Sequence, residues 1–485
     1  MSNPIEGLKP EGVWKYFAEI SKIPRGSKNE KQIAAYVMQK AKEFGLEAKQ
    51  DKFMTVVVRK PASPGYENRP MICLQGHLDM VCEKNKDTVH DFEKDPIELV
   101  RNGNVMMANG TTLGADNGIA VATNLAIMED KSLQHGPLEF LFTIDEETGL
   151  TGAANLKPGF VQSKILMNLD SEEEGELYVG CSGGKNTTGS WKVIFENAPG
   201  KTVAAMIRVK GLKGGHSGLE IDKGRGNSLK ILNRTLIGLS DLGVRIANME
   251  GGNKSNAIPR EAEALVYIPK AKLAQAKKVV GAYQHTTKAE LATVEPDLAI
   301  ELEVLKNVKK GRVIKKQLQA LVLKTIAGLP HGVIKMSADI PGLVETSTNV
   351  AVLRTEKGKI TLITSQRSSV ASEIMEICQT VACVFELGGS KVERTEGYPG
   401  WKPNLDSPIL KTAKSTYQSL YGKEPAVKAI HAGLECGIIG EKYPGMDMVS
   451  FGPTMQAVHS PDEKIYIDTV EKFWKFLLAI LKNVN

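Results

Sequence analysis

Short apolar runs alternate with amphipathic segments along the first 170 residues, and this alternation limits the possible fold more than any other feature of the chain. Apolar, β-branched runs of this length predict strands, and the spacing of the intervening segments predicts helices. Such an alternation predicts an α/β fold, in which ligands bind at the carboxyl ends of the strands. The predicted strands are FMTVVVRK (53–60), MICLQGHLDM (71–80), LEFLFTI (138–144) and KILMNLD (164–170), and helices are predicted over 12–23, 29–44 and 117–130.

The pattern changes twice along the chain. From about 187 to 396 it shows long amphipathic helices and alternating strands, for example the helical pattern over 270–294. From GYPGW at 397 the α/β pattern returns, and it ends in a helical pattern over 470–484. We therefore predict one domain formed by 1–186 and 397–485, interrupted by an inserted domain over 187–396 that is long enough to hold two similar lobes.

Composition excludes several classes of protein. A chain of 485 residues with 42% hydrophobic and 24% charged residues is typical of a soluble enzyme of two or three domains. The net charge is +6, but the basic residues are scattered, which argues against a nucleic-acid partner. The N-terminal twenty residues resemble an amphipathic helix rather than a signal peptide, and the chain has no apolar run long enough to span a membrane. Six dispersed cysteines without CxxC spacing indicate reduced thiols and a cytoplasmic protein.

Acids and histidines stand where the predicted strands end. His77 and Asp79 are two positions apart, so on a strand their side chains would share one face. Because strands of an α/β sheet can end at a common edge, we expect these side chains to converge. The remaining candidates are Asp116 in the glycine-framed loop GTTLGADNGI, the neighbouring Glu146 and Glu147, Asp170 in NLD, and His459 in the turn VHSPDE.

Five of these residues form a coherent set of ligands for two divalent metal ions: His77, Asp116, Glu147, Asp170 and His459. Imidazole with carboxylate suits zinc first, with manganese or cobalt as alternatives. One aspartate can bridge two ions that lie about 3.5–4 Å apart. One glutamate of the adjacent pair would then be a ligand and the other a general base, and the cations would stabilise the neighbouring carboxylates.

Each candidate taken alone has a simpler interpretation. His77 could be a structural histidine, and Asp116 could cap the helix that follows it. Asp170 could belong to a solvated turn and His459 to an ordinary loop. No pair has the diagnostic spacing of HExxH, so the metal interpretation depends on the convergence of all five.

Several longer motifs are similar to those of a known family. GHLDM, GTTLGADNGI, DEETGLTGA, NLDSEEEGELYVGCSGG, KGLKGGHSG, NAIPREA, IHAGLECG and GPTMQAVHSPDE occur in this order. Together they resemble the bacterial aminoacyl-histidine dipeptidases of the M20 metallopeptidase family, over nearly the whole chain. The resemblance implies a di-metal peptidase domain with a mixed sheet flanked by helices, interrupted by an α+β lid.

The resemblance also implies a role for each candidate residue of the catalytic domain. His77 and Asp170 would bind one ion, Glu147 and His459 the other, and Asp116 both. Asp79 would orient His77, and Glu146 would be the general base.

In the inserted domain, the resemblance implies that His216 of GGHSG stabilises the oxyanion. Asn256 of NAIPRE and Arg367 of TSQRSS are candidates for binding the substrate carboxylate, although His216 and Asn256 could instead form turns and Arg367 could be a surface charge.

The implied activity is hydrolysis of dipeptides with a free amino terminus, including Xaa-His. The alternatives are a tripeptidase or an N-acyl amino acid deacylase of the same family and, more distantly, a non-catalytic metal-dependent binding protein. The only partners that we expect are small dipeptides and, in a homodimer, a second copy of the chain.

Overall fold

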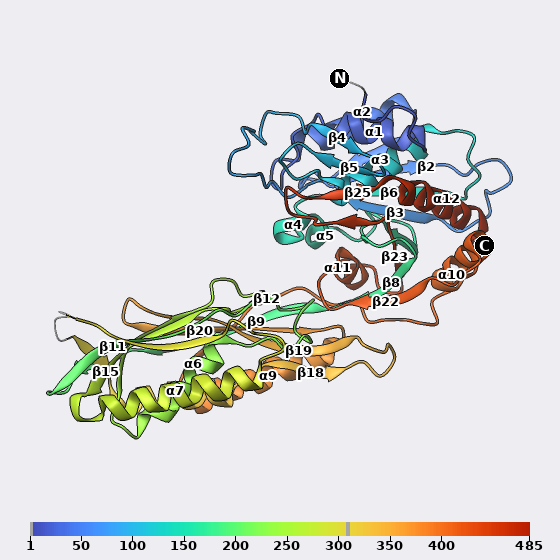
Figure 1. The fold of residues 1–485 in the computed structure, drawn as a ribbon. Coiled ribbons are helices and arrows are strands. Elements are labelled where there is room, and N and C mark those ends of the chain that lie inside the picture. Colours follow the sequence, from blue (N-terminus) through green and yellow to red (C-terminus); the bar gives the residue numbers. More distant parts are fainter. Residues whose placement is uncertain (1–2, 307–310) are drawn as a thin grey trace. The chain divides into compact units, whose positions relative to one another are not determined.

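The computed structural model describes residues 3–306 and 311–485. The chain divides into two compact units (Figure 1). Unit 1 comprises Met1–Gly180, Pro403–Ala429 and Leu434–Asn485, and unit 2 comprises Cys181–Lys402 and Ile430–Gly433.

Unit 1 contains a mixed sheet of eight strands in the order β1-β2-β6-β3-β7-β23-β8-β22. The four neighbouring strands β6, β3, β7 and β23 are parallel to one another, while β1, β2 and β8 pair antiparallel. Parallel strand ends of one polarity meet at a single edge, which is where an α/β sheet binds its ligands. The strands are β1 (Glu47–Gln50), β2 (Val56–Lys60), β3 (Ile72–His77), β6 (Leu138–Thr143), β7 (Ile165–Asn168), β8 (Glu176–Cys181), β22 (Ala426–Ile430) and β23 (Asp447–Ser450).

Every residue of β3 and β6 is buried, which requires cover on both faces of the sheet. Helix α3 packs against β3, α10 packs against β23, and α12 packs against α10. The apolar residues of α12 recur at helical spacing and are buried, including Phe473, Leu477 and Ile480. The helices of unit 1 are α1 (Glu11–Ile20), α2 (Lys31–Glu43), α3 (Ala115–Glu129), α4 (Glu146–Gly149), α5 (Thr151–Asn155), α10 (Pro408–Tyr421), α11 (Glu435–Lys442) and α12 (Ile467–Asn483).

A smaller antiparallel sheet in unit 1 has the order β24-β25-β5-β4. Its strands are β4 (Leu99–Asn102), β5 (Val105–Ala108), β24 (Met455–Gln456) and β25 (Lys464–Tyr466). The turn between β24 and β25 contains His459, so this hairpin determines where that histidine lies.

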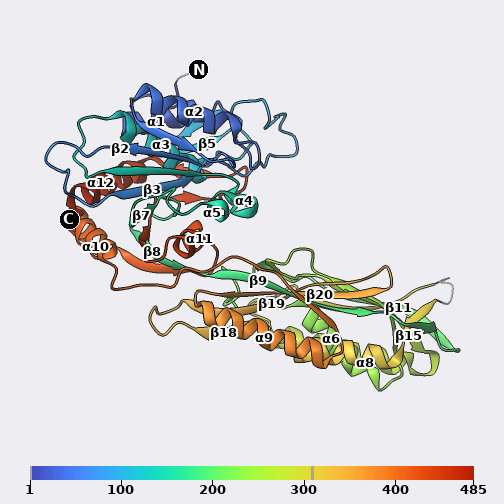
Figure 2. The ribbon, with the colours of Figure 1, turned by 180° about the vertical axis from the view of Figure 1, so that it is seen from behind.

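Unit 2 is built on an antiparallel sheet in the order β16-β11-β15-β13-β19-β20-β9-β21, with β18 on the edge of β19. Its long helices lie along one face of this sheet, as both views show (Figure 1, Figure 2). Strands β13 and β19 pair at a single position, Gly251 with Leu353. The two similar lobes proposed from the length of this region stay a prediction.

The core of unit 2 lies between the sheet and its helices and includes Ile207, Leu232, Val266, Val381 and Phe385. The strands are β9 (Gly183–Lys192), β10 (Phe195–Asn197), β11 (Thr202–Lys210), β12 (Gly215–His216), β13 (Arg245–Gly251), β14 (Ala257–Ile258), β15 (Ala262–Pro269), β16 (Ala299–Val304), β17 (Arg312–Ile314), β18 (Gly332–Met336), β19 (Val344–Glu356), β20 (Lys359–Ser368) and β21 (Lys391–Arg394). The helices are α6 (Ser228–Ser240), the short 3₁₀ helix η1 (Lys270–Lys272), α7 (Leu273–Glu290), α8 (Lys316–Gly328) and α9 (Ala371–Leu387).

The predicted α/β class is confirmed, and the predicted strands correspond to β2, β3, β6 and β7. The helical part of the N-terminal stretch begins only at Glu11, after Pro10, and Met1 and Ser2 lie outside the described residues. Strand β7 ends at Asn168, so Asp170 lies two residues beyond the strand. Among the described residues, no helix is both long and apolar enough to cross a membrane.

Candidate metal centre

The carboxyl ends of the parallel strands in unit 1 bring most of the predicted ligands together. His77 is the last residue of β3, Glu146 and Glu147 follow β6, and Asp170 follows β7. Asp116 comes from the start of α3, and His459 comes from the β24–β25 turn. Chain segments far apart in sequence therefore converge at one edge of the sheet, as predicted from the strand ends.

The convergence is close. The Nε2 atom of His77 lies 3.1 Å from Oδ1 of Asp116 and 3.4 Å from Oδ1 of Asp170. The Nε2 atom of His459 lies 3.1 Å from Oδ2 of Asp116 and 3.0 Å from Oε2 of Glu147. Each carboxylate oxygen of Asp116 thus contacts a different histidine, which is the arrangement expected of a ligand that bridges two ions.

Among the described residues, three groups that include a histidine have donor atoms close enough together to hold a metal ion. Two of them share Asp116: His77 with Asp116 and Asp170, and Asp116 with Glu147 and His459. The third contains His77, Glu146 and Glu147. Imidazole and carboxylate are the donors that zinc and similar divalent ions take, so the donor set fits the predicted cofactor.

Two buried carboxylate oxygens of the ligand groups fit a positively charged partner. Oε1 of Glu147 and Oδ1 of Asp170 make no hydrogen bond among the described residues, although Nε2 of His77 lies 3.4 Å from the second of these oxygens. Burial raises the pKa of Asp170 to about 6 although His77 lowers it. Hydrogen bonds to Asp116 and Glu147 raise the pKa of His459 to about 11. Positive charge from the imidazoles alone balances these half-buried carboxylates only in part, so divalent ions suit this site electrostatically.

Asp79 contacts both His77 and the glutamate pair. Nδ1 of His77 lies 3.2 Å from the backbone oxygen of Asp79 and 3.3 Å from its Oδ1, which leaves Nε2 of His77 directed at Asp116 and Asp170. The Asp79 carboxylate also accepts the backbone N–H groups of Glu146 (3.0 Å) and Glu147 (3.2 Å). One buried carboxylate therefore holds two of the converging segments together.

Glu146 lies beside this group without the close imidazole contact that Glu147 makes. Burial raises the pKa of the Glu146 carboxyl well above its usual value, His77 lowers it, and the carboxylates of Asp170, Glu435 and Glu147 raise it further. Such a carboxyl group can take up a proton more readily than an exposed glutamate, which is what a general base requires.

A fourth group, formed by Glu30, Asp79 and Asp145, consists only of acids and is wholly buried. Glu30 accepts the backbone N–H groups of Lys28 and Asp145, and Asp145 accepts the hydroxyls of Thr148 and Thr151. These hydrogen bonds reach Oε1 of Glu30 and both carboxylate oxygens of Asp145, while Oε2 of Glu30 has no hydrogen-bond partner among the described residues.

A buried polar chain that the sequence analysis missed crosses the four parallel strands beneath the ligands. Gln75 donates to Thr143 on β6 (3.2 Å) and to Glu435 of α11 (2.6 Å), and Asn168 on β7 donates to Gln75 (2.6 Å). Ser450 on β23 donates to Asn168 (2.5 Å). The available signal was a polar residue two positions before a ligand inside an apolar strand, as Gln75 precedes His77 and Asn168 precedes Asp170.

The remaining predicted residues lie in unit 2. His216 on β12 pairs with Ala257 on β14, so His216 and Asn256 are brought close by two adjacent short strands. Nδ1 of His216 accepts the backbone N–H groups of Gly218 (3.3 Å) and Leu219 (3.2 Å), which places the ring proton on Nε2. Burial and then the neighbouring Arg367 lower the pKa of His216 to about 4, so the imidazole is neutral at pH 7.

Arg367 on β20 is buried rather than a surface charge. Its Nη1 donates to the hydroxyl of Tyr398 (2.9 Å), and its Nη2 lies 3.4 Å from Nε2 of His216. Both nitrogen atoms carry N–H groups, so an oxygen acceptor beside the pair, about 3 Å from each nitrogen, would accept a hydrogen bond from both. Tyr398 lies in GYPGW, where the α/β pattern returns, and no role was predicted for it.

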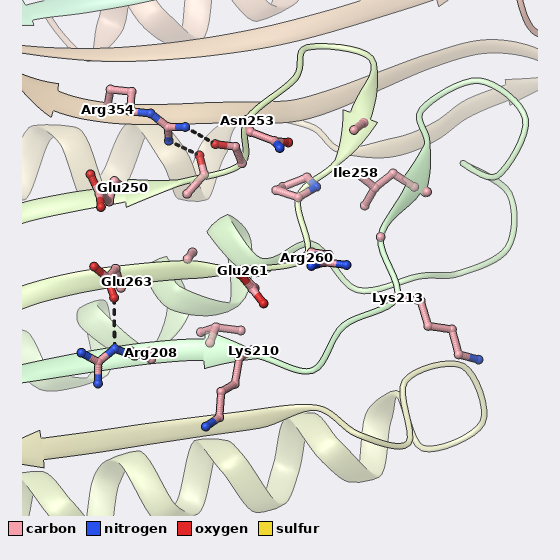
Figure 3. A pocket seen from close by; sticks show the side chains of 18 residues that line it. Arg208, Lys210, Lys213, Glu250, Asn253, Ile258, Arg260, Glu261, Glu263 and Arg354 are labelled. Carbon is pink, nitrogen blue, oxygen red and sulfur yellow. Dashed lines mark hydrogen bonds and ion pairs between the residues drawn. The ribbon is translucent and has the colours of Figure 1, made fainter. Parts of the chain in front are cut away.

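A pocket of about 780 Å³ in unit 2 adjoins the β12–β14 pair (Figure 3). Its described lining includes Gly215 and Ala257, the neighbours of His216 and Asn256, but not those two residues. Arg354 donates to the backbone oxygens of Gly251 and Gly252, and Arg208 pairs with Glu263 at 3.0 Å. Charged side chains therefore line this pocket beside apolar ones such as Val209 and Ile258.

The sequence is similar to that of a characterised enzyme along nearly its whole length. It is 42% identical over 478 residues to the cytosol non-specific dipeptidase of Escherichia coli, which covers 98% of each chain.

Solved structures give the same picture. The structure of the aminoacylhistidine dipeptidase from Vibrio alginolyticus superposes with a TM-score of 0.91 at 41% identity, covering 100% of this chain and 99% of that one. The aminopeptidase PepT from Bacillus cereus shares the fold, with a TM-score of 0.57 at 17% identity over 98% and 99% of the two chains. Residues 73–483 match the profile of peptidase family M20/M25/M40. Given this match and the similarity to the Escherichia coli enzyme over the whole chain, the protein belongs to peptidase family M20/M25/M40.

Proposed function

We propose that the protein is a metal-dependent dipeptidase that hydrolyses dipeptides with a free amino terminus, Xaa-His among them. The observation that carries this proposal is Asp116, whose two oxygens each lie 3.1 Å from a different histidine within two ligand groups. The names of the two relatives that are more than 40% identical support the substrate class.

The proposed cofactors are two divalent ions, zinc first. His77, Asp116 and Asp170 would hold one ion, and Asp116, Glu147 and His459 the other. When bound, these ions would supply Lewis-acid activation of the scissile carbonyl and of the attacking water.

The residues of the chain would then move the proton. Glu146 takes a proton from the attacking water and later delivers it to the leaving amine, because its carboxyl lies beside the ligands and has a raised pKa. Asp79 keeps this carboxyl in place through the backbone N–H of Glu146, and it keeps His77 in the orientation that its ligand role needs.

In unit 2, His216 and Arg367 would bind oxygen atoms of the substrate. The neutral His216 presents Nε2–H and Arg367 presents Nη2–H toward the same point, so the pair suits a carboxylate or an oxyanion. Asn256 is exposed and would assist in binding the substrate carboxylate. Its loop is held by Asn349, which donates to the backbone oxygens of Ser255 and Ala257. The lid role of residues 187–396 is part of this proposal.

The substrate's amino terminus would lie near acidic groups. Glu172 is half-buried, and burial followed by the charges of Asp116 and Asp170 raises its pKa to about 8. An ammonium group would relieve this crowding of carboxyls. A cytoplasmic location, supported by the name of the Escherichia coli relative, and a homodimer complete the proposal.

The test is a substrate panel on protein reconstituted with zinc: β-alanyl-histidine, other dipeptides, tripeptides, and dipeptides with an acetylated amino terminus. We expect turnover of free dipeptides, and loss of that turnover after chelation. Preference for tripeptides would identify a tripeptidase, and preference for acetylated substrates would identify a deacylase. Zinc binding without hydrolysis of any substrate would leave a binding protein.

A further inference from the structure

Glu463 makes an unusual set of hydrogen bonds in unit 1. Its Oε2 atom accepts the backbone N–H groups of Leu113 (2.8 Å) and Gly114 (3.0 Å). Its Oε1 atom accepts those of Ala115 (2.8 Å) and Asp116 (3.3 Å). One buried carboxylate, 2% exposed, thus binds four consecutive N–H groups.

The backbone of this turn is shaped to receive an anion. Gly114 has a φ of +69°, and a Cβ there would lie 2.6 Å from the guanidinium of Arg25, so only glycine fits. A left-handed residue within a turn directs successive N–H groups toward one point, which creates a concave anion site. Here the anion is a side chain of the protein itself.

Arg25 holds the same turn from the other side. It is buried, its Nη2 donates to the backbone oxygen of Gly114, and its Nη1 donates to the backbone oxygens of Leu78 (3.0 Å) and Asp79 (2.9 Å). The residues after β3 and the turn before α3 are therefore joined by one guanidinium. Its positive charge also compensates the buried carboxylate of Glu463.

The position of Glu463 connects two ligand segments. It follows His459 by four residues within the β24–β25 turn, and its own N–H donates to the backbone oxygen of Ser460 (3.1 Å). Through its side chain, this turn is attached to the backbone of Asp116. His459 and Asp116 are the two residues whose side chains lie 3.1 Å apart in the second ligand group.

We propose that Glu463 is a positioning residue of the metal centre, which holds Asp116 and His459 at the separation that their shared ion needs. The proposal rests on the proposed metal-dependent function. Partners behind the ligands typically change metal affinity by about 10–100-fold when they are removed. Glu463 binds the backbone N–H of Asp116 and lies in the same turn as His459. Its loss would therefore lower the metal affinity of the Asp116–Glu147–His459 group more than that of the His77–Asp116–Asp170 group.

A merely structural role would be to anchor the start of α3. Glu139 provides a matched control for that role, because it is also a fully buried carboxylate that accepts backbone N–H groups, those of Gln162 and Ser163 (both 2.8 Å). It lies near the start of β6, whereas the glutamate pair follows the other end of that strand. Loss of Glu139 should therefore affect stability but not the ligands.

The experiment compares wild-type protein with Glu463→Gln, Glu463→Asp and Glu139→Gln. Zinc affinity and stoichiometry are measured by competition with a chelating dye, and melting temperature is measured on the metal-free proteins. In Glu463→Gln the side-chain NH₂ group is a donor that faces two backbone N–H donors, so the turn should shift. We expect the zinc affinity of the Asp116–Glu147–His459 group to fall about 10–100-fold. Turnover should recover as free zinc is raised. Glu463→Asp keeps the charge but is shorter, and should give a smaller loss of the same affinity.

Two outcomes would overturn the inference: zinc affinities unchanged in both Glu463 variants, or an equal loss of affinity in Glu139→Gln. If Glu463→Gln does not fold, Glu463→Asp decides between these results. Wild-type protein that fails to bind two zinc ions would instead contradict the proposed function, so the two failures are distinguishable.

Discussion

At the scale of single residues, the adjacent Glu146 and Glu147 occupy different environments. Oε2 of Glu147 lies 3.0 Å from Nε2 of His459, and its Oε1 is a buried oxygen without a donor among the described residues. Glu146 has its pKa raised, chiefly by burial. Two neighbouring carboxylates can therefore perform two tasks, one as a ligand and the other as a base.

This difference predicts that two matched substitutions affect different properties, turnover in one variant and metal content in the other. Glu146→Gln should keep both metal ions but lose turnover by about 10²–10⁴-fold, because the amide cannot take the proton. Glu147→Gln should lose metal ions first. Metal content and turnover measured on the same preparations check this. Near-normal turnover in a metal-loaded Glu146→Gln protein would mean that another residue is the base.

At the scale of elements, the segment Ile430–Gly433 starts at the last residue of β22 and precedes α11. It belongs to unit 2, although the residues on either side of it in the chain belong to unit 1. The backbone N–H of Ser182 donates to the backbone oxygens of Ile430 (3.0 Å) and Ala432 (2.9 Å). His431 is buried, and its Nε2 lies 2.7 Å from the hydroxyl of Ser347. Backbone and side chain together attach this segment to Ser182, the residue before β9, and to β19.

The buried imidazole should make this attachment sensitive to acid. Burial and then Arg367 lower the pKa of His431 to about 3, so the folded protein resists a proton that the unfolded chain binds near pH 6.5. The unfolded state binds more protons between these values, and the free energy of unfolding should therefore fall as pH drops below about 6.5. The loss at pH 5 should be about 2 kcal/mol.

Denaturant unfolding of wild type and His431→Gln at pH 7 and pH 5 measures this effect. The glutamine cannot titrate, so its unfolding free energy should change less with pH than that of wild type. His285→Gln, at an exposed position on α7, is the matched control. Equal pH dependence in all three proteins would show that His431 takes no part in acid destabilisation.

At the scale of the whole molecule, the candidate ligands are confined to unit 1. Chelation would leave the half-buried carboxylates of Asp116, Glu147 and Asp170 without the proposed cations, while unit 2 contains none of the five candidate ligands. Ligand binding stabilises a folded unit by about 2.7 kcal/mol when the free ligand is at 100 times its Kd.

Calorimetry with and without a chelator should therefore show one transition shifted to lower temperature and another unchanged. Limited proteolysis of the chelated protein identifies the destabilised unit by its cleavage sites, which we expect in unit 1. Parallel shifts of both transitions would indicate that the two units unfold as one.

Local sequence was sufficient for much of the fold and for the convergence of the candidate ligands at one sheet edge. The apolar runs that became β3, β6 and β7 are buried on both faces, so their pattern was continuous and readable, and the residues after them had to lie at one sheet edge. The resemblance to a family supplied the role of each candidate, including the order of base and ligand in the glutamate pair.

The residues behind the ligands depended on the tertiary structure. Glu463 binds N–H groups some 350 positions earlier, Glu435 meets Gln75 across 360 positions, and Arg25 binds carbonyls after β3. Their partners are largely backbone groups, which every residue possesses and no sequence motif identifies. Chain periodicity reports which face of an element is apolar. Only the packed fold determines which distant backbone a buried charge must satisfy.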